Sequence, residues 1–211
     1  MGIAERKERE KEQKRNDIVD AAERLFFSNG FANTTMDEVA KEAEFSKGTL
    51  YLYFKSKEDL YLAITTRALN LLEHTFRSAI AKGRTGLEKV RSIGESYIGF
   101  ATEYPDYFNA MVYYESNDVD LKDSEGNAQA CEIQGMKTLQ VVAEAIMIGM
   151  QDGSIRDDLD PMLVATVLWG NSTGMITITT LKGEHLTEQH GMNIDDVIAT
   201  SFEMTMRALK K

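Results

Sequence analysis

The segment from Thr34 to Leu60, TTMDEVAKEAEFSKGTLYLYFKSKEDL, constrains the fold more than any other part of the chain. It contains three hydroxyl residues at positions where each is able to cap the start of a helix: Thr35, Ser46 and Ser56. Thr35 is followed three residues later by Glu38, which is the spacing of a capping box. The segment therefore predicts three short helices separated by tight turns.

The middle helix of the three carries short polar and basic side chains near its start, where Lys47, Gly48 and Thr49 follow one another. Two helices joined by a short turn, the second rich in such side chains, are typical of a helix-turn-helix that reads DNA. Charge agrees with this interpretation. The stretch from Phe45 to Lys57 holds three lysines and no acid, although the whole chain carries a net charge of −10. Such a basic island suits contact with DNA phosphates.

Within the middle helix, Leu50 and Phe54 lie four residues apart and are the better candidates for the core, which turns Tyr51 and Tyr53 outward. Lys47 and Thr49 lie at the start of the helix, where side chains reach base edges. We expect DNA contacts from Thr35, Ser46, Lys47, Gly48, Thr49, Tyr51, Tyr53 and Lys57.

The string from Ser46 to Leu60, SKGTLYLYFKSKEDL, resembles the recognition helix and the following helix of the TetR family of bacterial repressors. The resemblance covers about residues 15–60. It implies an all-α fold of about nine helices, with an N-terminal three-helix helix-turn-helix domain and a C-terminal helical domain for ligand binding and dimerisation. Glu44 departs from the family, which usually has glycine in this turn. Either the turn is shaped differently or the fold tolerates a strain of about 1–2 kcal/mol.

Three regions are expected along the chain: a charged N-terminal arm at residues 1–14, the DNA-binding domain at 15–60 and the effector-binding and dimerisation domain at 61–211. The arm is either a helical extension or mobile, and the first helix proper is expected from about residue 16. Further helices are expected at 57–81, 86–103, 105–114, 124–151, 161–182 and 193–209. Loops are expected at 115–125 and 182–192.

The resemblance implies a homodimer built from the last two helices, and Gly170, Ser172, Thr173 and Gly174 would permit close approach of two helices there. The same faces could instead pack within one subunit. Methionines and aromatic residues gather in the C-terminal half and suggest an apolar or aromatic effector. Core packing explains any single one of them better than a ligand site does. The candidate ligand-binding residues are Phe100, Phe108, Met111, Met136, Met147 and Trp169.

Other classes of function find little support. His74, His185 and His190 lack the spacing of metal ligands, and no nucleophile elbow or phosphate-binding glycine loop is present. No catalytic residue, metal or cofactor is therefore expected. Cys131, the only cysteine, suits a reducing cytoplasm. No run of 18 apolar residues or signal peptide is seen, so no membrane is expected. A helical adaptor that binds a protein instead of DNA remains the alternative to a regulator.

Overall fold

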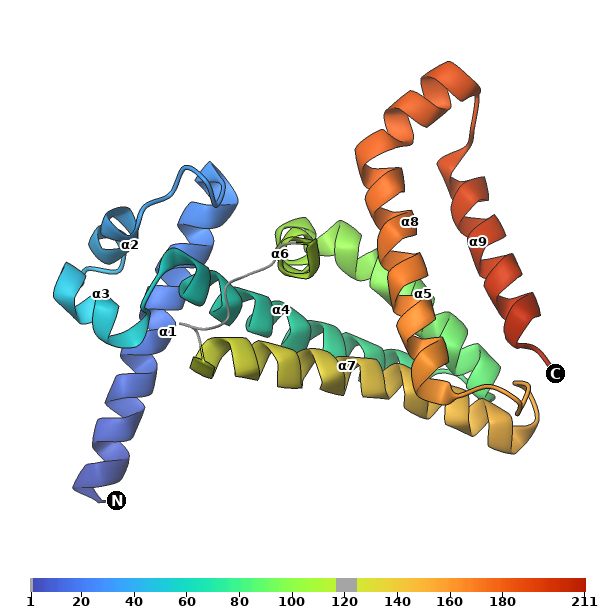
Figure 1. Ribbon diagram of the computed structural model, residues 1–211, viewed down its shortest axis with the longest axis horizontal. Coiled ribbons are helices and arrows are strands. Elements are labelled where there is room, and N and C mark those ends of the chain that lie inside the picture. The colour runs from blue at the N-terminus through green and yellow to red at the C-terminus, as the bar shows by residue number, and fades with distance from the viewer. Residues whose placement is uncertain (1, 117–124) are drawn as a thin grey trace. The chain divides into compact units, whose positions relative to one another are not determined.

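The computed structural model describes residues 2–116 and 125–211. Within these residues it contains nine α-helices and no strand, which confirms the predicted all-α fold. The helices are α1 (Ile3–Asn29), α2 (Met36–Glu42), α3 (Lys47–Tyr53), α4 (Lys57–Ile80), α5 (Gly86–Glu103), α6 (Pro105–Ser116), α7 (Glu125–Asp152), α8 (Pro161–His190) and α9 (Ile194–Leu209) (Figure 1). Apart from the ends of α6 and α7, the acidic loop predicted at 115–125 lies outside the described residues.

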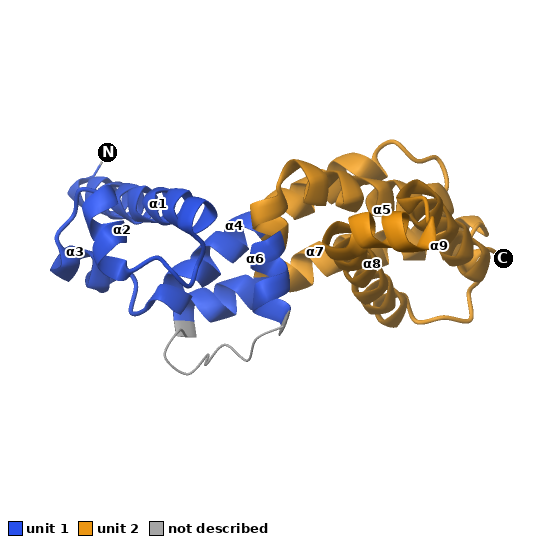
Figure 2. Ribbon diagram, turned by 90° about the horizontal axis from the view of Figure 1, so that it is seen from above, with its two compact units in different colours: residues 1–68, 109–133 blue, residues 69–108, 134–211 orange. Residues whose placement is uncertain are grey.

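The chain divides into two compact units (Figure 2). Unit 1 comprises residues 1–68 and 109–133, and unit 2 comprises residues 69–108 and 134–211. Helices α1, α2 and α3 belong to unit 1, helices α5, α8 and α9 belong to unit 2, and α4, α6 and α7 contribute residues to both. The domain boundaries predicted from the sequence stay predictions.

Local side chains start α2 and α3 as the sequence predicts. Thr35 Oγ1 accepts a hydrogen bond from the Glu38 N–H (3.3 Å), and Glu38 Oε2 accepts one from the Thr35 N–H (2.8 Å), so the capping box is present. Ser46 Oγ accepts a hydrogen bond from the Thr49 N–H (3.1 Å) and caps α3. Each bond satisfies a backbone donor that helix geometry leaves without a partner.

The turn between α2 and α3 places Glu44 in the left-handed region, with a φ of 58°. Glu44 is the only described residue other than glycine with a positive φ. The N–H of Glu44 donates to the Lys41 carbonyl (3.1 Å) and the N–H of Phe45 to the Ala40 carbonyl (2.9 Å), the bonds of a Schellman motif. The turn therefore has the shape that glycine favours, and the fold tolerates the strain at Glu44.

The charged arm forms a helical extension, which is one of the two predicted alternatives. Helix α1 begins at Ile3, and pairs spaced four residues apart, such as Arg6 with Glu10 (2.7 Å), support its charged first half. The end of α8 differs from the prediction. Helix α8 continues to His190, so the loop predicted at 182–192 is wrong over most of its length. It ends where Gly191 adopts a φ of 64°, which completes a left-handed cap.

In unit 2 the start of α5 lies against the end of α7. A Cβ atom added to Gly86 would stand 2.0 Å from the backbone nitrogen of Gly149, so only glycine permits this approach. The N–H of Gly86 donates to Asp152 Oδ2 (2.7 Å), and the N–H of Leu87 donates to Ser154 Oγ (3.1 Å). The end of α7 therefore satisfies the free donors at the start of α5.

Helix α8 is the one described helix that is long and apolar enough, by length and composition alone, to cross a membrane. Its apolar 18-residue window is only 11% buried inside the chain. The low burial of this window comes from one stripe of apolar side chains on α8. Its members are all exposed and recur at helical spacing: Leu163, Val167, Ile178 and Leu181. An exposed apolar stripe on a helix that packs against α9 is equally typical of an interface with another protein chain.

Replacing Glu44 by glycine will raise the free energy of unfolding by about 1 kcal/mol, because left-handed strain is relieved and only partly offset by the greater freedom of glycine in the unfolded chain. Urea denaturation of the two proteins measures the difference. Glu44→Ala is the control, since alanine keeps the strain and should leave stability within about 0.5 kcal/mol of the parent. Equal effects of the two substitutions would contradict this account of the turn.

Candidate nucleic-acid interface and apolar cavity

Helix α3 presents one face to the core of unit 1 and the other to solvent. Leu50 and Phe54 are fully buried, as the sequence predicts. Tyr51 is 43% exposed, and Tyr53 is half-buried. Gly48 lies on the exposed side, where an added Cβ atom would meet only Ser46 Oγ, at 3.9 Å.

Lys47, at the first position of α3, forms an ion pair with Asp37 of α2 (2.7 Å between Nζ and Oδ1). Both side chains are well exposed, and the hydrogen bond to Asp37 raises the pKa of the Lys47 ammonium. The contact is therefore a solvated surface pair of the kind that contributes little to stability. A phosphate that binds Lys47 must displace this carboxylate.

Lys57 is oriented differently from the prediction. Its ammonium donates to the backbone carbonyls of Phe31 (2.8 Å) and Thr34 (3.1 Å), and it lies 4.4 Å from the centre of the Phe31 ring. The Phe31 ring also contacts the rings of Tyr61 (4.7 Å) and Tyr113 (5.3 Å). The side chain of Lys57 thus holds the loop between α1 and α2, and is not directed at an external phosphate.

The side chain of Thr35 is also hydrogen-bonded within the chain. Besides its capping bonds, the Thr35 hydroxyl lies 2.8 Å from Glu38 Oε2. Hydrogen bonds from the Thr35 backbone and side chain lower the pKa of Glu38, so this carboxylate stays charged at neutral pH. Thr35 is exposed, but a phosphate approaching it would meet the Glu38 charge.

Behind α3, a chain of polar contacts that the sequence analysis missed fixes the exit of the helix. Asp59 is buried, and its carboxylate accepts hydrogen bonds from the Lys55 N–H (2.9 Å) and from Asn127 Nδ2 (2.8 Å). Asn127 Oδ1 in turn accepts one from Arg15 Nη2 (2.6 Å), and the Arg15 guanidinium lies 5.1 Å from the centre of the Phe54 ring. The spacing of Asp59 from Ser56 indicates a cap, but nothing local indicates Asn127.

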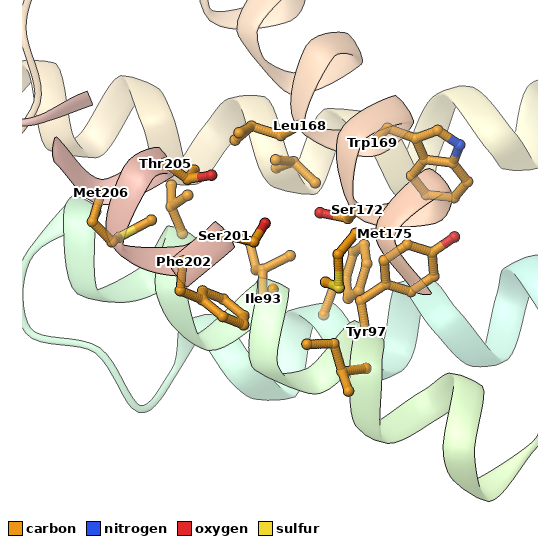
Figure 3. A pocket seen from close by; sticks show the side chains of 15 residues that line it. Ile93, Tyr97, Leu168, Trp169, Ser172, Met175, Ser201, Phe202, Thr205 and Met206 are labelled. Atoms are coloured by element: carbon orange, nitrogen blue, oxygen red, sulfur yellow. The ribbon is translucent and has the colours of Figure 1, made fainter. Parts of the chain in front are cut away.

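Unit 2 contains a narrow apolar cavity of about 50 Å³ (Figure 3). It is bounded by side chains of α4, α5, α7, α8 and α9. The lining residues are Phe76, Val90, Ile93, Gly94, Tyr97, Ile98, Val142, Leu168, Trp169, Ser172, Met175, Ser201, Phe202, Thr205 and Met206. The hydroxyl groups among them come from α5, α8 and α9.

Tyr97 is the centre of the aromatic packing beside this cavity. Its ring is stacked on Trp169 (5.4 Å between centroids) and meets Phe76 edge-on (5.8 Å). Its hydroxyl lies 2.9 Å from Thr173 Oγ1, which satisfies two buried polar groups together. Tyr97 therefore ties α5 to α8 through both its ring and its hydroxyl.

Of the six ligand-binding candidates from the sequence, only Trp169 lines the cavity. Met136 and Met147 are 46% and 43% exposed on α7. Three are buried without lining it: Phe100, Phe108 and Met111. No local sequence pattern indicates that Ser172, Ser201 or Thr205 lines a cavity, because their position depends on how three helices pack.

Chemistry other than binding is not evident in the described residues. They contain no group of three or more His, Cys, Asp or Glu side chains placed to hold a metal ion. Cys131 is buried, and burial raises the pKa of its thiol to about 11, so the reactive thiolate is scarce at neutral pH.

Comparison with known proteins agrees with the helix-turn-helix geometry. The family model described as bacterial regulatory proteins, tetR family, matches residues 18–64. A putative tetR family transcription regulator from Shewanella sp. PV-4 matches over 94% of this chain and 98% of its own, with a TM-score of 0.67 and 19% identity. Residues 18–64 therefore form a DNA-binding domain of the TetR type.

Other TetR-family relatives extend over different lengths. The fatty acid metabolism regulator protein of Bacillus subtilis is 25% identical over 170 residues, which are 80% of this chain and 84% of that protein. QacR of Staphylococcus aureus is 34% identical over 113 residues, covering 50% of this chain and only 58% of that protein. FadR from Bacillus subtilis, solved in complex with stearoyl-CoA, shares the fold with a TM-score of 0.69 and 19% identity, over 92% of this chain and 98% of its own.

The matched DNA-binding domain agrees with the predicted DNA partner, and the FadR complex shows that one protein of the same fold binds stearoyl-CoA. The matched domain favours DNA over the protein partner of an adaptor. Which residues of this chain contact DNA or an effector stays a prediction, and so does the homodimer.

Replacing Lys47 or Lys57 by methionine will separate the two roles described above. Lys47→Met should lower the slope of log affinity against log salt by about 1, because one positive charge that releases counterions from the DNA is lost. Lys57→Met should leave that slope unchanged and lower the free energy of unfolding by about 1–3 kcal/mol, because it removes charged hydrogen bonds to two carbonyls. DNA titrations at several salt concentrations and urea denaturation provide the two measurements. A reduced salt slope for Lys57→Met would show that its ammonium contacts DNA.

Proposed function

We propose that this protein is a ligand-responsive repressor that binds a two-fold symmetric operator as a homodimer and is released by a small apolar or aromatic effector. The observation that carries the proposal is the exposed face of α3, which lies opposite the buried Leu50 and Phe54 and is flanked by lysines. A recognition helix in the major groove has this arrangement.

Base contacts are assigned to the exposed side of α3. Lys47, Thr49 and Tyr51 project from it, and Lys47 or Thr49 at its start would reach base edges. Lys55 is exposed just beyond α3 and is placed for a phosphate. Thr35 and Lys57 take supporting positions, since their side chains are engaged within the chain.

Dimerisation is assigned to α8 and α9. The exposed stripe of α8 has Gly170 and Gly174 at its centre, and a Cβ atom added to either would meet nothing within 4 Å. Such glycines permit the close approach of a second helix, while Ile178 (56% exposed) and Met204 (68% exposed) supply apolar area. Ser172 and Thr173, which we had expected on this face, are directed inward: Ser172 lines the cavity and Thr173 bonds to Tyr97.

The effector is assigned to the cavity of unit 2. Ligand pockets usually enclose about 300–1,000 Å³, so an effector has to widen this cavity by moving α5, α8 or α9 apart. The lining is mostly apolar with a few hydroxyls, which favours an apolar or aromatic molecule. The complex of the related FadR with stearoyl-CoA supports an apolar effector.

Coupling between effector and operator follows from thermodynamic linkage. If the effector favours a dimer whose recognition helices are wrongly spaced, it weakens operator binding by the same factor that the operator weakens effector binding, about 5–150-fold. Helix α4 is suited to transmit the change, because Lys57 begins it just after α3 and Phe76, near its end, lines the cavity.

No catalytic activity is proposed, since the relatives are transcriptional regulators. A DNA-binding regulator acts where the DNA is, and we place this one in the cytoplasm of a bacterium. The apolar character of α8 is assigned to the dimer interface and not to a membrane span.

Affinity selection from random duplex DNA at about 150 mM salt, followed by sequencing, tests the proposed function. We expect an enriched site with two-fold symmetry and half-sites about 34–36 Å apart. The selection is repeated with protein refolded free of any bound molecule. Absence of enrichment from the refolded dimer would refute sequence-specific binding.

Ile178→Glu should weaken dimerisation by at least about 100-fold, because a carboxylate would be buried in an apolar interface. Sedimentation equilibrium measures the dissociation constant. Leu52→Glu is the matched control, since it also places an acid at an exposed apolar residue but on α3, and should leave the dimer intact. A dimer that survives Ile178→Glu unchanged would exclude this stripe as the interface.

A further inference from the structure

Leu52 is the most exposed apolar side chain of the described part of the chain, with 84% of its surface accessible. It lies near the end of α3, two residues after the buried Leu50. Successive residues of a helix are rotated by about 100°, so Leu52 lies nearly opposite Leu50 and points directly away from the core. A leucine in this position gains nothing from the packing of its own chain.

Gly48 lies four residues before Leu52 and therefore on the same face of α3. Glycine weakens a helix, and it is retained in proteins where a positive φ or a close neighbour requires it. Neither reason holds within this chain, because Gly48 lies inside α3 without a positive φ and an added Cβ atom would approach only Ser46 Oγ, at 3.9 Å. A close neighbour from outside the chain accounts for Gly48.

Together, Gly48 and Leu52 define the requirements of that neighbour. It must approach the start of α3 closely and offer an apolar group one helical turn later. Two lysines flank this face: Lys55 is exposed, and Lys47 is exposed and paired with Asp37 across the surface. Their ammonium groups favour a neighbour that is negatively charged overall and able to displace the Asp37 carboxylate. The major groove of DNA meets all three requirements, since the C5 methyl of thymine is its one apolar group.

We propose that Leu52 determines operator specificity by contacting the C5 methyl group of a thymine in each half-site. The inference rests on the proposed function, because it requires that α3 enter the major groove. Leucine has no hydrogen-bonding group, so it distinguishes thymine only through this methyl. Gly48 provides the space in which the groove floor comes near enough for the contact.

The test uses the full-length dimer and the operator obtained by selection. Each thymine of a half-site is replaced in turn by deoxyuridine, together with its symmetry mate, which removes only the methyl groups. Affinities are measured for the parent protein and for Leu52→Ala. At one position the parent should lose about four-fold per half-site, the value of one buried methyl-sized group. Leu52→Ala should bind the thymine and deoxyuridine operators equally at that position.

Controls separate the contact from other effects. Leu52→Ala should unfold at the same temperature as the parent, because the side chain is exposed. Deoxyuridine at the other thymines should change the affinity of the two proteins by the same factor. These positions are the control for effects of deoxyuridine on the shape of the DNA. Leu52→Ala in the protein and deoxyuridine for thymine in the operator together form a double-mutant cycle, which isolates the interaction between the leucine side chain and the methyl group.

Three results would overturn the inference while leaving the proposed function standing. They are a selected half-site without thymine, an insensitivity of the parent to every deoxyuridine, and an equal loss by the parent and Leu52→Ala at each position. If instead the dimer selects no site at all, the proposed function fails, and the inference fails with it.

Discussion

The buried carboxylate of Asp59 is the interaction on which the geometry of the DNA-binding unit depends. A buried charge is costly unless its oxygens are hydrogen-bonded, so the N–H of Lys55 and the amide of Asn127 have to stay in place. The first fixes the chain where it leaves α3, and the second attaches the start of α7. Through Asn127 the network reaches Arg15, whose guanidinium covers the ring of Phe54. Helices α1, α4 and α7 therefore act together as the rigid support of α3.

The sequence was sufficient where structure is decided by neighbours along the chain. The caps at Thr35 and Ser46, the buried face of α3 and the all-helical class depend on spacings of three or four residues. It was insufficient where the deciding partner is remote. Lys57 is directed inward by carbonyls 23 and 26 residues away, and no local pattern contains that information. Helix α8 is longer than predicted, and Gly183, which lies within it, packs beside Ile194 in the structure.

The residues that line the cavity were even harder to predict from the sequence, because they come from several helices that are remote along the chain. A count of methionines and aromatic residues identifies the half of the chain that is rich in them, but not the faces that converge. Tyr97 and Trp169 converge because α5 and α8 pack together, whereas Met136 and Met147 point to solvent from α7. In addition, Phe202 approaches α5 at Gly94, where an added Cβ atom would stand 2.7 Å from the ring. The cavity is therefore narrow because aromatic side chains close it, and side chains rearrange more readily than backbone.

The pair between Lys47 and Asp37 has a consequence for how the protein searches a genome. In the proposed complex any duplex, whatever its sequence, offers phosphates to Lys47, and each competes with the Asp37 carboxylate that pairs with it at 2.7 Å. The internal competitor subtracts from binding at every site alike, so it shortens the time spent on wrong sequences. Only a site that also offers base contacts binds tightly enough to offset this loss of affinity. Because the loss is the same at every site, Asp37 leaves the ratio of specific to non-specific affinity unchanged and shortens the residence of the protein on all sequences.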